Sequence, residues 1–495
     1  MVGDNFSLKH ILGLKIKDLR TEKDISFQEL SAATGLSVSY LSEIEKGKKY
    51  PKGDKIIALA QALDVTYDYL VSLKVSRRLE PVIELLNSDI FKEFPLEAFG
   101  LDPQKVVELI SVSPDKINAF ITTIGLIARN YEMGQEHFYF AALRSYQEMH
   151  DNYFADLEKE VKAFQRQYKD LLKAPVTANA LKDVLKNHFG IEVDRSVLHN
   201  KEELRDLRSY YNDKQKKLLL NTGLTSEQES FLIGREIGFQ LLQLQQRPKE
   251  TPPQKGYNFE VTLNNYKASY FSAALIIPEK DIVEDVKRTA ANNTWDENVI
   301  FGFIKKYRAT PEMLMQRLTN ILPKHFGIKN LFFLRFVGTD DFSQYDLTKE
   351  LHLTRAHSPH ANGLNESYCR RWISLRVIKQ LRAATKFGKN PKLITGAQIS
   401  KYHGTSDEYL CLSMAFPNVS NEAESISLTI GFYIDNDLKK RIKFTEDAGI
   451  KSRIVSTTCE RCSWADCEDR IAAPLIVQRE ENKRRIEAAL DALEK

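Results

Sequence analysis

The residues best suited to chemistry in this 495-residue sequence are its cysteines, and all five follow residue 368. Three of them, Cys459, Cys462 and Cys467, fall within nine residues. A C-x2-C pair can place two thiolates on one soft metal, and a third thiolate after four further residues adds a third ligand. Disulfides are rare in a reducing compartment, which favours metal binding over a structural disulfide. The spacing therefore predicts a metal site, and ordinary reduced cysteines around a turn are the alternative.

Charge and hydropathy around the cysteines refine this prediction. Arg461 and Arg470 bring positive charge, which lowers the pKa of a thiol and partly offsets the charge of a bound cluster. Cys411 lies in an apolar strand pattern, residues 409–414, so we expect it to be buried in packing rather than to act as a ligand. Residue types alone leave an iron–sulfur cluster and zinc both open.

A second set of functional residues lies near the N-terminus, where residues 25–47 read as two short helices joined by a tight turn at Gly35. Glycine suits such a turn because it adopts positive φ without strain, and Ser37 is placed to cap the second helix. Four small or polar positions of that helix face outward: Val38, Ser39, Ser42 and Glu43. In a major groove the serines can bond to several bases, the glutamate can accept from a cytosine amine, and the valine can touch a thymine methyl. The pattern indicates a helix-turn-helix that reads DNA.

Positive charge follows this second helix directly. Five lysines fall within ten residues against one acid: Lys46, Lys48, Lys49, Lys52 and Lys55. A lysine run in isolation is usually a solvated loop. Its place beside a recognition helix instead predicts phosphate contacts and salt-dependent binding.

The helices around this motif extend the pattern to about seventy residues. Further amphipathic segments precede and follow it at residues 12–20, 56–65 and 67–70. The whole stretch resembles the Cro/repressor-type (XRE) helix-turn-helix domain. The family usually has a phosphate-binding Gln where this chain has Phe27, and the neighbouring Gln28 is the candidate substitute. The resemblance carries base contacts over to Val38, Ser39, Ser42 and Glu43. The residues that we expect to contact DNA are Gln28, Ser37, Val38, Ser39, Tyr40, Ser42, Glu43, Lys46, Lys48 and Lys49.

The middle of the chain has a pattern of elements that is typical of a hydrolytic domain. A strand at residues 217–221, a charged turn and a helix at residues 230–239 resemble the ImmA/IrrE metallopeptidase-like domain. Active members carry His-Glu-x-x-His on that helix, which places two zinc ligands on one face. Here Arg235 and Phe239 take the histidine positions, and Glu236 alone keeps its place. Asn265 or Lys267 stands where the acidic ligand is expected, so we expect no catalytic residues and no enzyme activity.

The C-terminal end gives the most specific resemblance. Residues 458–474 resemble the C-terminal domain of the short-chain fatty-acyl transcriptional regulators, and residues 367–372 resemble the Cys-x-x-Trp segment upstream of it. That resemblance implies an acyl-coenzyme A effector and, in some members, a four-iron (4Fe-4S) cluster. It implies Cys459, Cys462 and Cys467 as metal ligands, with Cys369 as the fourth. No Gly-rich phosphate loop is present, so the residues that would bind the acyl ligand stay unassigned.

Together these features predict a multidomain fold. We expect an all-α five-helix head at residues 1–74, an α-helical connector at 75–173, an α+β ImmA/IrrE-like middle at 174–335 and an α+β C-terminal sensor at 336–495. Residues 135–168 form the longest helical candidate, with aromatic side chains suited either to a dimer contact or to packing within the domain.

Composition bounds the function. The charge of +4 is nearly neutral for this length, so nucleic-acid affinity must be local, and 42% hydrophobic residues are ordinary for a globular protein. No apolar run long enough to span a membrane and no signal segment is present, so we expect a cytoplasmic protein. The sequence favours a homodimeric, effector-sensing regulator that binds operator DNA. An ImmA-like zinc peptidase acting on a repressor, or a phage- or stress-type repressor with a structural C-terminal half, are the alternatives.

Overall fold

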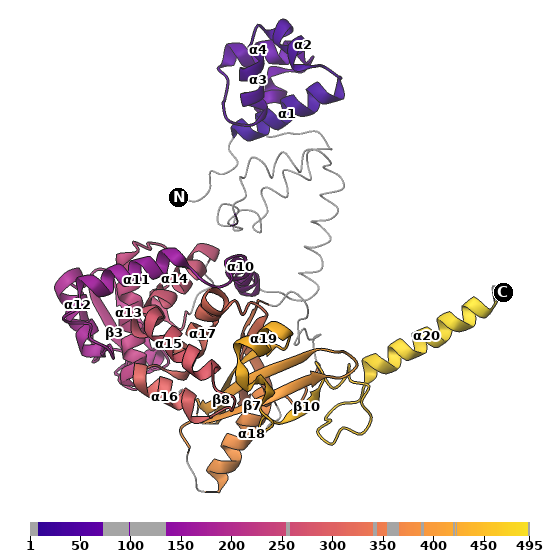
Figure 1. The fold of residues 1–495 in the computed structure, drawn as a ribbon. Helices are drawn as coiled ribbons and strands as arrows, with labels where there is room; N and C mark the ends of the chain where they lie inside the picture. The colour runs from indigo at the N-terminus through magenta and orange to yellow at the C-terminus, as the bar shows by residue number, and fades with distance from the viewer. Residues whose placement is uncertain are drawn as a thin grey trace. The chain divides into compact units, whose positions relative to one another are not determined.

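The computed structural model describes residues 8–72, 99, 135–253, 258–339, 344–353, 366–387, 391–418, 421 and 423–493 (Figure 1). The chain divides into two compact units, the first comprising Met1–Ala142 with Gly256–Glu260 and the second Leu143–Lys255 with Val261–Lys495. Most of the expected connector, including residues 73–98 and 100–134, lies outside the described residues. The structure confirms a multidomain chain in which a helical head precedes mixed α/β regions. No helix among the described residues is long and apolar enough to cross a membrane.

The head is the expected five-helix bundle. Its helices are α1 (Leu8–Glu22), α2 (Phe27–Thr34), α3 (Val38–Glu45), α4 (Gly53–Ala62) and α5 (Tyr67–Val71). Apolar residues from all five helices form one core, which includes Leu12, Ile16, Leu30, Leu41, Ile44, Leu59 and Leu70. Burial of this continuous apolar surface is what holds helices as short as α3 and α5 together, because such short helices are marginal alone in water.

Local signals fix the ends of the two central helices. Ser26 caps α2, and the Glu29 carboxylate accepts from the Ser26 backbone N–H at 2.7 Å, which completes a capping box. Gly35 ends α2 with φ +69°, the left-handed conformation that the sequence predicts there. Gly13 allows α1 to lie against the end of α3, because a Cβ at this position would meet the Ile44 carbonyl oxygen at 2.4 Å.

Two further helices follow the head among the described residues. The single helix expected over residues 135–168 is wrong: α10 (Gln135–Met149) and α11 (Ala155–Gln167) are separate helices. Between them Asp151 and Asn152 both adopt positive φ, at 48° and 53°. The Asn152 side chain donates to Thr319 Oγ1 at 2.9 Å and accepts from the Tyr266 hydroxyl at 2.6 Å. These distant partners hold the break, and the local sequence does not show them.

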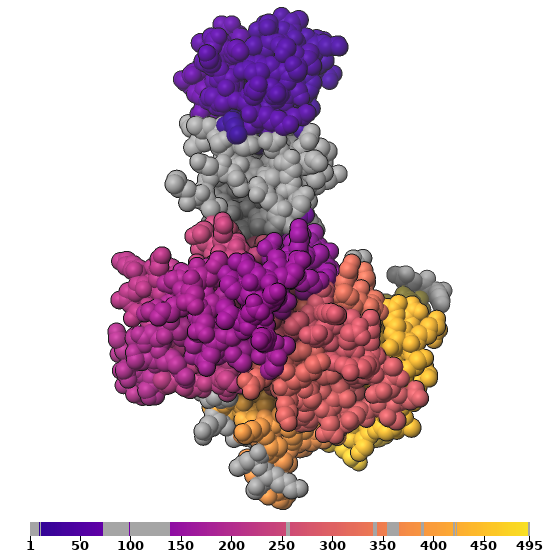
Figure 2. All heavy atoms as spheres, turned by 60° about the vertical axis from the view of Figure 1, so that its left-hand side comes forward, coloured from indigo at the N-terminus to yellow at the C-terminus, as the bar shows by residue number. Residues whose placement is uncertain are grey.

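A small sheet and six further helices follow. The sheet has the order β1-β3-β2-β4 and consists of β1 (Glu192–Asp194), β2 (Ser209–Asn212), β3 (Lys217–Leu220) and β4 (Glu250–Thr251). The helices are α12 (Ala178–Phe189), α13 (Ser226–Leu241), α14 (Phe259–Ile276), α15 (Glu279–Ala290), α16 (Asn298–Tyr307) and α17 (Pro311–Phe326), with a short 3-10 turn η2 (Glu202–Leu204). The magenta and salmon segments of this unit form one continuous surface in Figure 2.

A six-stranded sheet completes the second unit. Its order is β10-β7-β8-β9-β5-β6, and neighbours are antiparallel except that β10 (Ser452–Val455) runs parallel to β7 (Ile394–Tyr402). The other strands are β5 (Leu331–Thr339), β6 (Tyr345–His352), β8 (Glu408–Pro417) and β9 (Glu424–Tyr433). The expected domain boundary after residue 335 falls within β5.

Helices cover both faces of this sheet. α18 (Ile373–Lys386) packs on β5, β7, β8 and β9, whereas α17 packs on β5 and β9. Apolar residues of α17 and α19 (Asn436–Arg441) share one core with the sheet, and a 3-10 turn η3 (Lys443–Glu446) follows α19. The final helix, α20 (Leu475–Leu493), extends from the sheet region and buries none of its described residues (Figure 1).

Candidate nucleic-acid interface and cysteine site

The outward face of α3 is built as the sequence predicts. The Ser37 hydroxyl accepts from the Tyr40 backbone N–H at 3.3 Å, which caps the helix. Leu41 and Ile44 are fully buried and fix the inward face. Val38, at 42% exposed, lies on the opposite side. The remaining predicted contact residues of α3 are exposed or half-buried: Ser37, Ser39, Tyr40, Ser42 and Glu43.

Charged side chains surround this face. Lys49 Nζ lies 3.3 Å from a Glu43 carboxylate oxygen, and both side chains are solvent-accessible. Lys55 Nζ lies over the Tyr40 ring, 4.4 Å from its centroid. Lys46 and Lys48 are exposed, and Gln28 is exposed in the first turn of α2. Because Lys49 is paired with Glu43, the phosphate-contacting and base-contacting groups of this surface are electrostatically coupled.

Arg20 and Glu45, which position α3, were not singled out by the sequence. Arg20 Nε and Nη2 bind the two oxygens of Glu45 at 2.6 and 3.1 Å, which ties α1 to the last turn of α3. The same guanidinium lies 4.1 Å from the centroid of the Phe27 ring. Phe27 therefore packs within the head at the place where the family pattern has a phosphate-binding Gln. An Arg and a Glu twenty-five positions apart give no local signal of such a pair.

Lys15 on α1 is another residue that the sequence did not single out. Its side chain is fully buried, and Nζ donates to the backbone carbonyls of Tyr69 at 2.5 Å and Ser72 at 2.6 Å. Burial lowers the pKa of Lys15 to about 8. The contact holds α1 against the C-terminal end of α5, where the carbonyl ends of a helix favour a cation.

Helix α13 carries a buried ion-pair cluster around Glu236. Arg247 Nη1 and Nη2 bind the two Glu236 oxygens, each at 2.9 Å, and Gln240 Nε2 donates to Glu236 at 2.8 Å. The Arg247 guanidinium also lies 4.4 Å from the centroid of Phe239. The Glu236 carboxylate is buried, and both of its oxygens have partners.

Four of the cysteines line one cavity near the edge of the large sheet. Cys369 precedes α18, whereas Cys459, Cys462 and Cys467 lie in the loop between β10 and α20. Backbone pairing brings these distant segments together, since Cys459 N–H donates to the Ser367 carbonyl at 3.0 Å and Cys369 N–H donates to the Thr457 carbonyl at 3.2 Å. The structure therefore places Cys369 beside the C-terminal cluster.

Two arginine side chains make several hydrogen bonds in this loop, and only one of them supplies the positive charge that the sequence predicts near the thiols. Arg461 binds Glu366 through two hydrogen bonds, at 2.8 and 2.6 Å, so its charge is already paired. Arg470 donates to the backbone carbonyls of Cys459 at 2.9 Å and Cys462 at 3.0 Å, and to two further carbonyls of the loop. Arg470 lines the cavity together with Arg370 and Arg371, neither of which the sequence singled out. The expected positive charge near the thiols is present, but Arg461 does not supply it.

Three of the four cysteines that line the cavity are buried, and Cys467 is partly exposed. Burial raises the pKa of Cys369 to about 11, so this group is protonated at neutral pH. Four thiols converging on one cavity match a soft metal in donor type. However, no group of three or more His, Cys, Asp or Glu side chains within the described ranges is arranged to hold a metal ion. Metal binding would thus require the sulfurs to deprotonate and move closer together.

Cys411 stands apart from this group. It lies in β8, is buried, and has its pKa raised to about 12 by burial. It does not line the cysteine cavity. This placement agrees with the expectation that Cys411 contributes packing.

Comparison with known proteins matches the head. A helix-turn-helix family model matches residues 16–70. An uncharacterized HTH-type transcriptional regulator (y4dJ) of Sinorhizobium fredii is 35% identical over 65 residues, which is 13% of this chain and 84% of that protein. Among solved structures, a Mycobacterium tuberculosis transcriptional regulator aligns with 68% of this chain and 93% of its own, at 14% identity and a TM-score of 0.49.

The capped α3 helix, its exposed polar face and these matches define the protein class as a DNA-binding transcriptional regulator. The chain belongs to the XRE-type helix-turn-helix transcriptional regulators.

Proposed function

We propose that the regulator reads operator DNA with the exposed face of α3 and anchors it with the lysines that follow. The observation that carries this proposal is the orientation of α3: its buried residues face the bundle core, and its Ser, Val and Glu side chains face outward. The proposed base-contacting residues are Val38, Ser39, Ser42 and Glu43. Gln28, Ser37, Tyr40, Lys46, Lys48 and Lys49 are proposed to contact or support contacts to the DNA backbone.

The test is a selection of preferred duplexes by the full-length protein, followed by variants of two kinds. Ser39→Ala with Glu43→Ala is expected to change the preferred sequence, because each lost base contact costs about 1–3 kcal/mol at its own position. Lys46→Ala with Lys48→Ala is expected to weaken all duplexes alike and to lower the salt slope by about 2. Lys440→Ala, at an exposed position of α19, is the control for the loss of a positive charge away from the head. The proposal fails if the full-length protein prefers no duplex at low ionic strength.

We further propose that the second unit senses an effector and that the protein acts as a homodimer. The resemblance of residues 458–474 to the short-chain fatty-acyl regulators supports an acyl-coenzyme A thioester as that effector. Effector binding would shift the population of dimer arrangements that match the operator spacing. Thermal shift of the full-length protein with acetyl-, propionyl- and butyryl-coenzyme A tests this, with free coenzyme A as the control. Equal shifts with all four ligands would contradict acyl recognition.

The cysteine cavity is proposed as a second input. Cys369, Cys459, Cys462 and Cys467 would supply the thiolate ligands, and Arg470 would hold two of their backbone segments in place. An iron–sulfur cluster would bring redox sensitivity, whereas zinc would act as a structural cross-link. The convergence of four thiols on one cavity supports this input.

Catalysis is not part of the proposed function. The engagement of Glu236 by Arg247 and Gln240 supports a peptidase-like domain that has lost hydrolysis. Arg235 and Phe239 offer no nitrogen or sulfur lone pair to zinc.

A further inference from the structure

A buried guanidinium without a carboxylate partner lies on α13. Arg235 is 8% exposed, and its Nη1 and Nη2 atoms reach the side-chain oxygens of Asn265 and Ser209, each at 3.4 Å. Nη2 also donates to the Thr251 hydroxyl. All three acceptors are neutral, and two of the contacts are long. Among the described residues, the buried Nε atom has no hydrogen-bond partner.

The charges around Arg235 do not balance it. Glu236 is the nearby acid, but both of its oxygens are already bound by Arg247. Arg247 and Arg208 add two further positive charges that act on Arg235. Burial lowers the pKa of Arg235 to about 10, so the group still carries its charge at neutral pH. A buried cation without a counter-charge is costly, and a bound anion removes that cost.

The residues around Arg235 lie close to the surface of the second unit. Arg235 projects from α13 towards Asn265 on α14 and the strands β2 and β4. Asn265 and Thr251 are half-buried, and Arg208 at the start of β2 is exposed. The guanidinium therefore lies one side chain below the surface. A planar fork of N–H donors matches the two oxygens of a carboxylate or phosphate group.

We propose that Arg235, assisted by Arg208, binds a small oxyanion, either free or as the anionic group of a larger ligand. The site presents a fixed, buried guanidinium as a positive centre that recognises negative charge. Bound oxyanion would replace the long contacts of Nη1 and Nη2 with charge-assisted hydrogen bonds. The proposal depends neither on DNA reading nor on the cysteine cavity.

The test measures binding of inorganic phosphate and of acetate to the full-length protein by calorimetry and thermal shift, against chloride at matched ionic strength. At least one oxyanion is expected to raise the melting temperature above the chloride control, and the stronger of the two identifies the ligand class. Arg235→Met is expected to weaken that binding at least tenfold, and Arg235→Lys to retain part of it. Arg479→Met, on exposed α20, is expected to change nothing.

Two results would overturn the proposal. One is a thermal shift with phosphate and acetate no larger than that with chloride. The other is an equal shift in the wild type and in Arg235→Met. Should Arg235→Met fail to fold, the same binding measurement is made on Arg208→Met, which changes an exposed position. Unchanged oxyanion affinity in Arg208→Met would remove the assisting role of Arg208 and overturn the site as proposed.

Discussion

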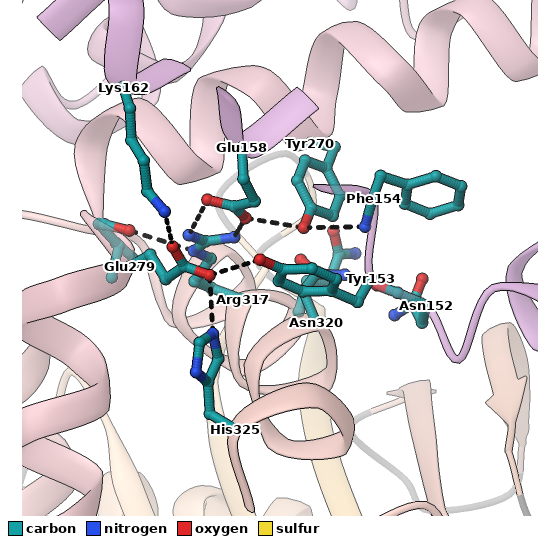
Figure 3. Close-up of polar contacts among 12 residues, drawn as sticks. Asn152, Tyr153, Phe154, Glu158, Lys162, Tyr270, Glu279, Arg317, Asn320 and His325 are labelled. Carbon is teal, nitrogen blue, oxygen red and sulfur yellow. Dashed lines mark hydrogen bonds and ion pairs between the residues drawn. The ribbon is translucent and has the colours of Figure 1, made fainter. Parts of the chain in front are cut away.

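Arg317 and Glu158 form an ion pair sealed from solvent, with side chains 0% and 3% exposed (Figure 3). Arg317 Nη2 binds Glu158 Oε2 at 3.0 Å, and Arg317 Nε donates to the Ile277 carbonyl at 3.1 Å. The Tyr270 hydroxyl donates to Glu158 at 2.7 Å. The pair joins α11 to α17 through the core of the second unit, and both charges have several partners.

Arg317→Met alone is expected to lower the free energy of unfolding by about 3–5 kcal/mol, because it leaves the Glu158 charge buried without its counter-ion. Arg317→Met combined with Glu158→Leu is expected to recover most of that loss, since neither charge then remains. Urea denaturation of both variants measures the difference. A double variant less stable than the single one would show that the hydrogen bonds of Glu158, and not its charge, dominate.

Gly13→Ala is expected to destabilise the head by about 1–3 kcal/mol through overpacking. The added methyl would lie 2.4 Å from the Ile44 carbonyl oxygen and 2.8 Å from that of Glu45, so α1 must move away from α3. The protection of the α3 amides against hydrogen exchange and the operator affinity should fall together. Gly302→Ala in α16 is the control, because no atom lies within 4 Å of the Cβ that it adds. Helix propensity predicts that this variant gains about 0.5–1 kcal/mol in the free energy of unfolding. Unchanged α3 exchange in Gly13→Ala would contradict the close approach.

Glu279 is expected to make stability depend on pH in the acid range. Burial alone would raise its pKa, but hydrogen bonds from Lys162, Tyr153 and His325 lower the pKa to about 2 (Figure 3). A carboxylate with a folded-state pKa below its ordinary value of 4.5 contributes its full stability above pH 4.5. That contribution is lost as the pH falls from 4.5 towards 2.

Glu279→Gln removes this titration. Its free energy of unfolding is therefore expected to fall less steeply than that of the wild type between pH 4.5 and 3, although the variant is less stable at pH 7. Urea denaturation at a series of pH values measures both slopes. Parallel curves for the two proteins would rule out Glu279 as the source of the acid sensitivity.

The cysteine cavity predicts which thiols matter for metal content. Cys462→Ser is expected to abolish bound metal in protein purified without oxygen, as measured by elemental analysis and visible absorption. Cys411→Ser is expected to leave the metal content unchanged, because Cys411 lies in β8 outside the cavity. If both variants lose metal equally, or if the wild type contains no metal, the four cysteines of the cavity are structural thiols and not metal ligands.

The sequence by itself determined the head, because its signals are local. Ser26, Ser37 and Gly35 mark helix ends within a few residues of the groups that they satisfy, and the apolar spacing of α3 assigns its inward and outward faces. The cluster of Cys459, Cys462 and Cys467 was visible for the same reason. The resemblance to a peptidase helix in which Arg235 and Phe239 replace two histidines stays a prediction.

Only the tertiary structure decided how distant residues meet. The expected helix ends near Asn152, and Glu236 is bound by Arg247. Arg235 is buried among neutral oxygens, and Cys369 lies beside the C-terminal thiols. Each of these outcomes depends on burial and on partners remote in the chain. Periodicity records which side of a helix is apolar, but the free energy of a buried charge is set by what the fold places next to it.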